Sequence, residues 1–473
     1  MDRGDPADTR SGADSGTQPG SQRSLLADLI RREIDAAGGK LPFDRFMDLV
    51  LYAPGLGYYV AGAPKLGPEG DFVTAPEISP LFARCLAVTC REVLSALGKR
   101  GTKNGSGRDG LREPSAGRAS GHGDLREPSA GRASGHGDLL KPGIGSGPMR
   151  GDLLELGAGT GALAAELLAT LAAQGALPKR YLILEPSPDL AERQRQTLTE
   201  RVPELLARCH WLERLPERFD GVVLANEVLD AMPVHRFQIG DAGQVQEVCV
   251  GIEGAAGAGA GTGTGTGTGA GADQGASERL VEILAEPATP ALQAAVAALQ
   301  ANGLATRPGY RSEINLRLAP WTQALGTMLN AGLLLLIDYG YPRAEFYLDE
   351  RDQGTLMCHS RHRAHSDPYR DLGLQDITAH VDFSALAEAG RAAGLRLAGY
   401  TTQANFLIGC GIDALIAEAG ADDPQALLEL TAGAKQLLLP SQMGERFQVL
   451  GLSKGLDAHA LSGFSVRDLS ARL

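Results

Sequence analysis

The sequence predicts an α/β protein built on a mostly parallel β-sheet with helices on both faces. Two apolar runs, "DLLEL" (152–156) and "GLLLLIDYG" (332–340), are too continuously hydrophobic to be strands with one face in water. A glycine-rich turn, "GAGTG" (157–161), follows the first run directly. Helical stretches alternate with further strands, as is typical of parallel sheets, and ligands of such sheets bind at the carboxyl ends of the strands.

The individual elements follow from local patterns. Leucines and isoleucines at helical spacing predict a helix that begins near Ser24 and ends at Gly38 and Gly39. Similar spacing predicts helices over 43–50 and 80–97. The elements expected after these are a strand at 152–156, a helix at 162–174, a strand at 180–187, a helix at 189–200, and strands at 219–227, 332–340 and 447–454.

Composition divides the chain further. The first 23 residues are polar and lack the apolar stretch of a leader, so we expect a disordered tail in a cytoplasmic protein. A 14-residue unit, "LREPSAGRASGHGD", occurs twice in tandem, and a Gly/Ala/Thr tract contains no core-forming residue. The expected organisation is a tail at 1–23, a helical and lid segment at 24–98, a linker at 99–147, the first half of the ligand-binding domain at 148–240, an insertion at 241–310 with the tract at 254–277, and the second half at 311–473.

Charge and cysteine usage exclude several functions. The formal net charge of -12 argues against a nucleic-acid partner, which requires a clustered basic surface. The six cysteines show no ligand spacing, so we expect free thiols and no metal site. No apolar run approaches the ~20 residues of a transmembrane segment. The oligomeric state cannot be inferred from the sequence.

The glycine turn favours S-adenosyl-L-methionine (SAM) over a dinucleotide. It fits the loose dinucleotide pattern, but Glu155 stands two residues before Gly157, where its charge would repel a pyrophosphate and could pair with the ammonium group of SAM. Glu185 ends the next strand and could accept hydrogen bonds from the ribose hydroxyls of SAM or NAD. An NAD enzyme therefore stays an alternative. The predicted cofactor residues are Glu155, Gly157, Gly159, Gly161, Glu185 and Asn226.

Acidic residues after the strand at 219–227 suggest a cationic acceptor. In "ANEVLDAMP", Asn226, Glu227 and Asp230 emerge at the carboxyl edge of the sheet. A guanidinium is a permanent cation that carboxylates orient well, so we expect Glu227 and Asp230 to clamp one. The alternative is an Asn226 helix cap with solvated carboxylates. The segment "DYGYP" (338–342) should line the acceptor side, with a structural role for Asp338 as an equal alternative. His380 is a candidate to act on an acceptor proton, although a structural histidine is favoured.

Longer blocks resemble a known family. "LLELGAGTG" resembles motif I of class I SAM-dependent methyltransferases, and "GDFVTAPEISPLF", "LANEVLDAMPVHRF" and "LLLPSQMGERFQVLGLSK" are similar to the MidA family. The resemblance runs from about 43 to 454, and Ala83 departs from the usual glycine. It implies a Rossmann-like, mostly parallel seven-stranded sheet and SAM as cofactor. Because the family includes the mitochondrial complex I assembly factor, it also implies transfer to a protein arginine, with a complex I subunit as a candidate acceptor.

The resemblance also implies a lid. The loop over 52–80 precedes the SAM domain in the family and packs over it, so it should close the pocket and exclude water. A small-molecule methyltransferase, or a non-catalytic assembly factor that binds SAM, remains an alternative. The residues expected in the lid or near the acceptor are Asp71, Phe72, Thr74, Pro76, Glu77 and Glu313.

Overall fold

The computed structural model describes residues 19–61, 73–103, 149–254, 279–361, 363–420, 423–456 and 461–473. Residues 1–18 of the expected tail, most of the repeat-containing linker, nearly all of the Gly/Ala/Thr tract and two expected lid residues, Asp71 and Phe72, lie outside the described residues. Residues 19–23, expected in the disordered tail, instead belong to the helix that was expected to begin near Ser24. No helix in the described part of the chain is long and apolar enough to cross a bilayer.

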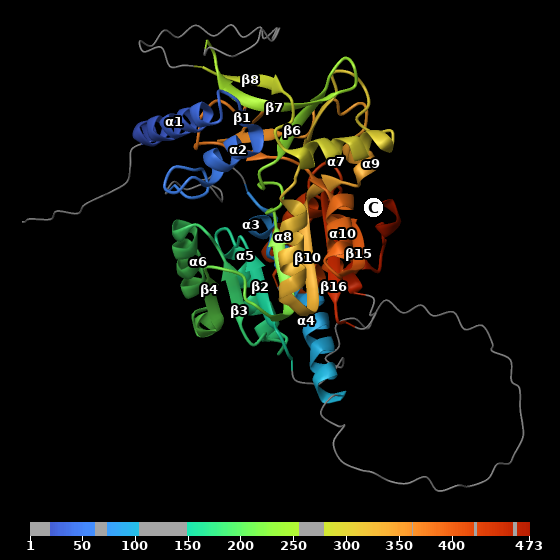
Figure 1. Ribbon diagram of the computed structural model, residues 1–473. Coiled ribbons are helices and arrows are strands. Elements are labelled where there is room, and N and C mark those ends of the chain that lie inside the picture. Colours follow the sequence, from blue (N-terminus) through green and yellow to red (C-terminus); the bar gives the residue numbers. More distant parts are fainter. Residues whose placement is uncertain are drawn as a thin grey trace, which may run out of the picture.

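The centre of the molecule is a mostly parallel sheet, which confirms the α/β class (Figure 1). Its strands follow the order β15-β16-β10-β5-β2-β3-β4, and β14 pairs beside β10. The neighbours from β4 to β10 pair in parallel, whereas β16 is antiparallel to β10 and to β15. The bounds are β2 Asp152–Leu156, β3 Tyr181–Leu184, β4 Cys209–Leu212, β5 Phe219–Asn226, β10 Leu329–Tyr341, β14 Val381–Asp382, β15 Arg396–Thr402 and β16 Phe447–Lys454.

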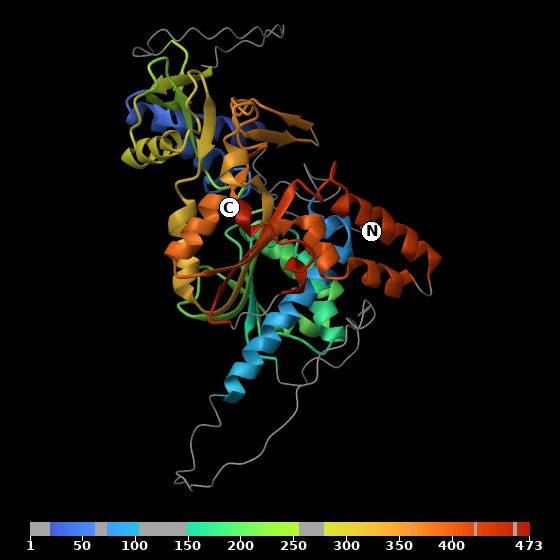
Figure 2. The same ribbon diagram turned by 90° about the vertical axis from the view of Figure 1, so that its right-hand side faces the viewer.

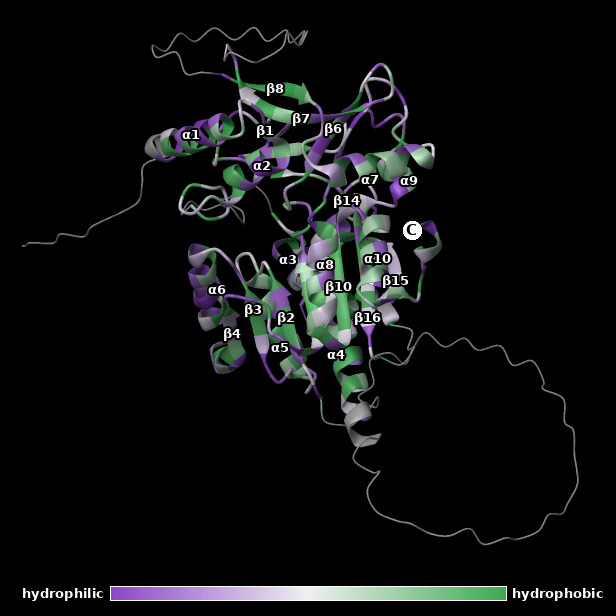
Figure 3. Cartoon of the chain, in the orientation of Figure 1, coloured by the Kyte–Doolittle hydropathy of each residue, from purple (hydrophilic) through white to green (hydrophobic). Residues whose placement is uncertain are grey.

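Helices cover both faces of this sheet because successive strand residues point to opposite sides. Leu153 packs into the hydrophobic core on one face, whereas Leu154 packs into the core on the other. Figure 3 shows the result as hydrophobic colouring along β10 and α4 and hydrophilic colouring on α6. The first face holds α4 (Pro80–Lys103), α5 (Ala162–Ala173), α6 (Pro188–Arg201), α11 (Gln403–Gly409), α12 (Ile412–Gly420) and α13 (Pro424–Leu438), and the second holds α8 (Leu318–Met328) and α10 (Phe383–Ala392).

A second, antiparallel sheet lies beyond the carboxyl edge of the first (Figures 1 and 2). The chain leaves β5 at Asn226 and enters β6 at His235, which places this module next to the strand ends. The β6–β7 hairpin spans the boundary expected at residue 240. The module contains α1 (Pro19–Ala36), β1 (Leu41–Pro42), α2 (Phe43–Tyr52), β6 (His235–Ile239), β7 (Val245–Ile252), β8 (Leu280–Ala285), α7 (Pro290–Ala301), β9 (Arg311–Ile314) and α9 (Arg343–Phe346).

Two smaller features complete the described fold. The short helix α3 (Ala75–Ile78) stands directly before α4. A three-stranded sheet contains β11 (Met357–Ser360), β12 (Arg363–His365) and β13 (Asp376–Thr378) and projects from the second module in Figure 2.

Candidate functional site

A cavity of about 820 Å³ lies at the carboxyl ends of β2 to β5, where they face α2 and α3. Two groups of lining residues differ in character. The glycine wall comes from the ends of β2, β3 and β4, and the carboxylate wall comes from the turn after β5 and from the N-terminal segment. We define the glycine wall as Glu155, Gly157, Gly159, Glu185, Trp211 and Glu213, and the carboxylate wall as Tyr52, Tyr59, Glu77, Asn226, Glu227 and Ala231.

The glycine turn brings bare backbone to the cavity. Gly157 has φ +64° and Gly161 has φ +82°, which are left-handed conformations that residues with a Cβ rarely adopt. A Cβ on Gly157 would lie 3.2 Å from a methyl group of Val228, and one on Gly161 would lie 3.1 Å from the Cα of Gln194. The loop therefore forms a close-fitting cradle that larger residues would fill or distort.

Both predicted carboxylates of this wall line the cavity and have hydrogen-bond donors. Glu155 is buried at the end of β2, and its Oε2 accepts a hydrogen bond of 2.7 Å from the Tyr181 hydroxyl. Burial raises the Glu155 pKa to about 7. Glu185 accepts from the backbone N–H of Ser187 at 3.0 Å and from the side chain of Gln194 at 3.0 Å.

Gln194 on α6 is an organising residue that sequence reasoning missed. Its fully buried side chain donates to the Gly159 carbonyl and to Glu185, each at 3.0 Å. Its Oε1 accepts a hydrogen bond of 2.9 Å from the Trp211 indole. One amide therefore holds the glycine turn, the end of β3 and the end of β4 in register. No motif marks it, because the polar helix around it resembles any solvated helix.

Asp338 fixes the backbone of the turn after β5 by accepting hydrogen bonds from it. Its Oδ2 accepts from the backbone N–H groups of Leu229 at 2.9 Å and Asp230 at 3.2 Å, and its Oδ1 accepts from that of Tyr339. Asp338 is fully buried and is not among the residues that line the cavity. The expectation that it lines the acceptor side is therefore corrected to a role in shaping this turn.

Asp230 also faces away from the cavity. It is buried, and its Oδ2 accepts a hydrogen bond from the Tyr339 hydroxyl behind the turn. Burial raises its pKa to about 6. The expected clamp assumed a helical turn that would put Glu227 and Asp230 on one face. Instead, Glu227 has φ +54°, so no helical turn forms, and Glu227 lines the cavity whereas Asp230 does not.

Glu227 itself lines the cavity together with Asn226. Its Oε1 accepts a hydrogen bond of 3.2 Å from the Asn226 amide, and the backbone N–H of Ala75 also donates to its carboxylate. Burial, and then the nearby Asp230, raise the Glu227 pKa to about 8. The Asn226 side-chain oxygen is buried without a hydrogen-bond partner.

Helix α3 brings the expected lid residues Thr74, Pro76 and Glu77 to the cavity. Thr74 and Glu77 form a capping box, which fixes the start of this short helix. Glu77 Oε1 also accepts a hydrogen bond of 3.1 Å from the Thr160 hydroxyl. The segment before α4 is thereby tied directly to the glycine turn.

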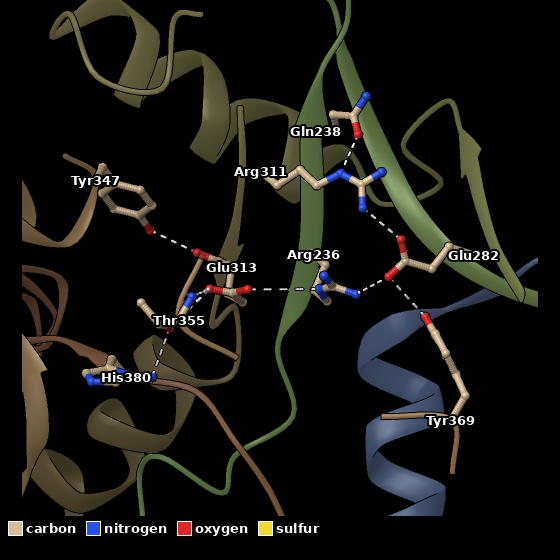
Figure 4. Close-up of polar contacts among 9 residues, drawn as sticks. All are labelled: Arg236, Gln238, Glu282, Arg311, Glu313, Tyr347, Thr355, Tyr369 and His380. Atoms are coloured by element: carbon tan, nitrogen blue, oxygen red, sulfur yellow. Dashed lines mark hydrogen bonds and ion pairs between the residues drawn. The ribbon is translucent and has the colours of Figure 1, made fainter. Parts of the chain in front are cut away.

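Two other expected site residues lie elsewhere. Glu313 is on β9, whose pairing with β6 places it in the second sheet. Its carboxylate accepts from the backbone N–H and hydroxyl of Thr355 and faces Arg236 at 3.9 Å (Figure 4). His380 donates its backbone N–H to the Thr355 hydroxyl, and its ring stacks on Tyr341.

Glu313 and His380 line a separate cavity of about 230 Å³, so neither contributes to the large one. Burial lowers the His380 pKa to about 4, as expected for a neutral packed histidine. The expected acceptor position of Glu313 is corrected to the second sheet, and the expected catalytic position of His380 is corrected to the residue directly before β14, where its ring lines the smaller cavity. The error for Glu313 arose because nothing local in the sequence indicates a second sheet.

Two tyrosines of the carboxylate wall were not predicted. The rings of Tyr52 and Tyr59 stack with centroids 5.5 Å apart and planes at 19°. The Tyr52 hydroxyl donates to the Ala231 carbonyl at 2.9 Å, and the Tyr59 hydroxyl donates to Asp376 at 2.9 Å. The aromatic run "YAPGLGYYV" was visible in the sequence, but the turn that it contacts is 179 residues away.

Curated relatives cover most of the chain. The chain is 26% identical over 449 residues to "Protein arginine methyltransferase NDUFAF7, mitochondrial" of Danio rerio, a match that covers 90% of this chain and 86% of the relative. The corresponding protein of Bos taurus is 27% identical, with 93% and 86% covered. The expectation of a cytoplasmic location is wrong, because these relatives are named as mitochondrial proteins.

A solved structure and a family model agree with the geometry of the cavity. A candidate methyl transferase of Burkholderia thailandensis, crystallised with S-adenosyl-homocysteine, is 38% identical and superposes with a TM-score of 0.77 over 97% of this chain and 99% of its own. The model of a family described as "Putative S-adenosyl-L-methionine-dependent methyltransferase" matches residues 143–401. The chain belongs to this family of SAM-dependent methyltransferases.

Proposed function

We propose that this enzyme transfers a methyl group from SAM to an arginine side chain of a protein. The observation that carries the proposal is a half-buried carboxylate, Glu227, that faces the cavity without a cationic partner. Its hydrogen-bond donors are an amide and a backbone N–H. Among the described residues, no arginine or lysine forms an ion pair with Glu227, and the same holds for Asp230 and Asp338 behind it.

A carboxyl group without a cationic partner favours a cationic acceptor, whose charge would stabilise the ionised form. Removing a carboxylate from water is costly unless a partner of opposite charge replaces the lost hydration. An arginine guanidinium supplies that charge and matches a carboxylate with two parallel N–H donors. The names of the curated relatives, which are protein arginine methyltransferases, support the same class of acceptor.

The residues of the glycine wall fit SAM. The backbone of Gly157 and Gly159 would lie against the methionine portion, and Glu155 would pair with its ammonium group. Gly161 does not line the cavity and instead sets the course of the turn against Gln194. Glu185 would accept from the ribose hydroxyls, and the apolar surface around Trp211 would flank the base. Bound SAM supplies an electrophilic methyl group.

The carboxylate wall would then orient the acceptor. Glu227 pairs with the guanidinium, directs one nitrogen toward the glycine wall and accepts the proton that this nitrogen releases as it gains the methyl group. The free oxygen of Asn226 accepts a second N–H of the same group. Such positioning is the main contribution that an enzyme makes to an in-line displacement.

We also propose that α3 belongs to a lid, consistent with its hydrogen bond to the glycine turn. Closure would exclude water from the reacting groups. The division of the chain into a lid segment, two halves of a methyltransferase domain and an insertion remains part of this proposal. A subunit of respiratory complex I is our candidate acceptor.

The direct test is to incubate the purified chain with SAM and a panel of unmodified proteins that includes complex I subunits. Mass spectrometry should find methylarginine on a defined residue, and the same residue should lose its methyl group in cells without the gene. Methyl transfer confined to small molecules, or binding of SAM without any transfer, would contradict the proposal.

A further inference from the structure

We propose that the stacked pair Tyr52 and Tyr59 is the surface on which the acceptor guanidinium lies, and that it selects arginine over lysine. The inference rests on the proposed function and specifies the acceptor side of the same cavity. Both tyrosines line that cavity in the same wall as Glu227, and both rings are partly exposed.

The two rings are fixed in orientation. The Tyr52 hydroxyl donates to the carbonyl of Ala231, four residues after Glu227 in the same turn. The Tyr59 hydroxyl donates to Asp376. The fully buried Tyr58 packs against the Tyr59 ring edge-to-face, with centroids 5.1 Å apart. The aromatic pair is therefore anchored to the turn that carries Glu227 and supported from behind.

The hydrogen bonds determine what the tyrosines offer to a ligand. Both hydroxyls are already engaged, so the exposed part of each residue is aromatic ring surface. Burial also raises both tyrosine pKa values well above their ordinary range, so neither phenol is suited to act as a base. Their contribution is a rigid aromatic face beside a carboxylate.

A guanidinium suits this combination better than an ammonium group does. The guanidinium is planar and weakly hydrated, so it can stack on an aromatic ring while its edge donates two N–H groups to a carboxylate. A lysine ammonium is compact and strongly hydrated, and it has no flat face to stack. The two features of this wall, a ring face and a carboxylate, therefore recognise two different surfaces of one arginine side chain.

The test measures binding and needs no turnover. N-acetyl-arginine methylamide and its lysine counterpart are titrated into the full chain, saturated with S-adenosyl-homocysteine, by calorimetry. The arginine probe should bind about tenfold more tightly than the lysine probe. Tyr52→Leu and Tyr59→Leu should each weaken arginine binding by about tenfold, whereas Tyr52→Phe and Tyr59→Phe, which keep the ring, should stay within about threefold of the wild type.

Two controls separate recognition from folding. S-adenosyl-homocysteine affinity should change less than about twofold in all four variants, because the glycine wall is untouched. Trp211→Leu should weaken the binding of S-adenosyl-homocysteine. Its affinity for the arginine probe should stay near that of the wild type. Equal affinity of the wild type for both probes, or unchanged arginine affinity in both leucine variants, would overturn the inference.

Failure of the proposed function would give a different result. If arginine is not the acceptor, the wild type neither binds the arginine probe nor forms methylarginine. If only the stacking inference is wrong, the wild type binds the probe and forms methylarginine, and the leucine variants match it in both measurements.

Discussion

The two walls of the cavity differ in the charges that surround their carboxylates. On the glycine wall, Glu185 accepts from a backbone N–H and from Gln194, and Glu155 accepts from a tyrosine hydroxyl. On the carboxylate wall, Glu227 likewise accepts from an amide and a backbone N–H, but two further carboxyl groups, Asp230 and Asp338, lie behind it and disfavour its charged form. The glycine wall is defined by backbone shape, whereas the carboxylate wall is defined by charge that a ligand must neutralise.

The difference indicates two kinds of binding site in one cavity. A site built from fixed hydrogen bonds is ready before its ligand arrives. A site with uncompensated charge is destabilised when empty and gains most from a cationic ligand. Perturbing the first wall should therefore change cofactor affinity, and perturbing the second should change acceptor use and the stability of the free protein.

The largest expected effect is on the glycine wall. Gly161→Val places a branched side chain at φ +82°, with its Cβ 3.1 Å from the backbone of Gln194. S-adenosyl-homocysteine affinity should fall by at least about a hundredfold, since backbone strain and a steric clash act together at the cradle. Calorimetry measures the loss directly.

Gly175→Ala is the matched control for that variant. Gly175 also has a left-handed conformation, φ +62°, but nothing lies within 4 Å of the Cβ position. It should lower stability by about 1 kcal/mol without changing cofactor affinity. Normal binding in Gly161→Val would show that the glycine turn is not the cofactor cradle.

The next effect concerns the carboxylate wall. Glu227→Gln keeps the side-chain shape but removes the charge that pairs with the acceptor. Loss of a charge-assisted hydrogen bond of ~1.5–3 kcal/mol should slow transfer by about one to two orders of magnitude. S-adenosyl-homocysteine affinity should barely change.

Glu213→Gln provides the reciprocal comparison, because Glu213 lines the glycine wall. It should change cofactor affinity and leave transfer at saturating SAM near the wild-type rate. If Glu227→Gln keeps full turnover, or if it loses cofactor affinity in parallel with turnover, the separation of the two walls is wrong.

The same contrast explains how much could be predicted from sequence. Part of the glycine wall is contiguous in the chain, so "LELGAGTG" revealed Glu155, Gly157 and Gly159. The carboxylate wall is assembled from tertiary contacts. Tyr52 forms a hydrogen bond with Ala231, which is 179 residues away in the chain, and no local sequence pattern predicts that contact.

The predicted positions of several site residues were wrong for identifiable physical reasons. Asp230 was expected beside Glu227 on a helical turn, but the left-handed φ of Glu227 and the hydrogen bonds from the turn to Asp338 redirect it. Glu313 was misplaced because the second sheet escaped detection. That sheet contains a two-residue strand, and the chain between β7 and β8 includes the Gly/Ala/Thr tract.

A smaller effect is expected from the residue that joins the parts of the glycine wall. Gln194→Leu keeps a similar volume but removes the bonds to Gly159, Glu185 and Trp211. Cofactor affinity should fall by about tenfold, because the three strand ends lose their common partner and Glu185 loses one donor. At saturating SAM, the KM for the acceptor should not change. A loss of acceptor affinity instead would mean that the two walls are coupled through α6.

The smallest expected effect is a pH-dependent difference in thermal stability of the free protein. The Glu227 pKa is about 8, against an ordinary value of 4.5, because burial disfavours its charged form. A raised carboxyl pKa contributes stability that is complete below pH 4.5 and is lost as pH rises through 8. Glu227→Gln removes this titration, so its Tm should match the wild type at pH 5 and exceed it by a few degrees at pH 8.5.

The difference between the two proteins is the relevant measure, because other groups titrate in both. Asp230 and Glu155 also have raised pKa values and lower the stability as pH rises, whereas His380, with a pKa lowered to about 4, lowers it as pH falls. These contributions cancel in the comparison unless they couple to Glu227, as Asp230, Glu77 and Asp338 do, and Asp230 has the largest influence of the neighbouring acids on the Glu227 pKa. Repeating the wild-type and Glu227→Gln scans in the Asp230→Asn background removes that coupling. A Tm difference that does not vary with pH would mean that Glu227 is already charged and compensated in the free protein. The carboxylate wall would then have no unpaired carboxylate for a cationic acceptor to stabilise.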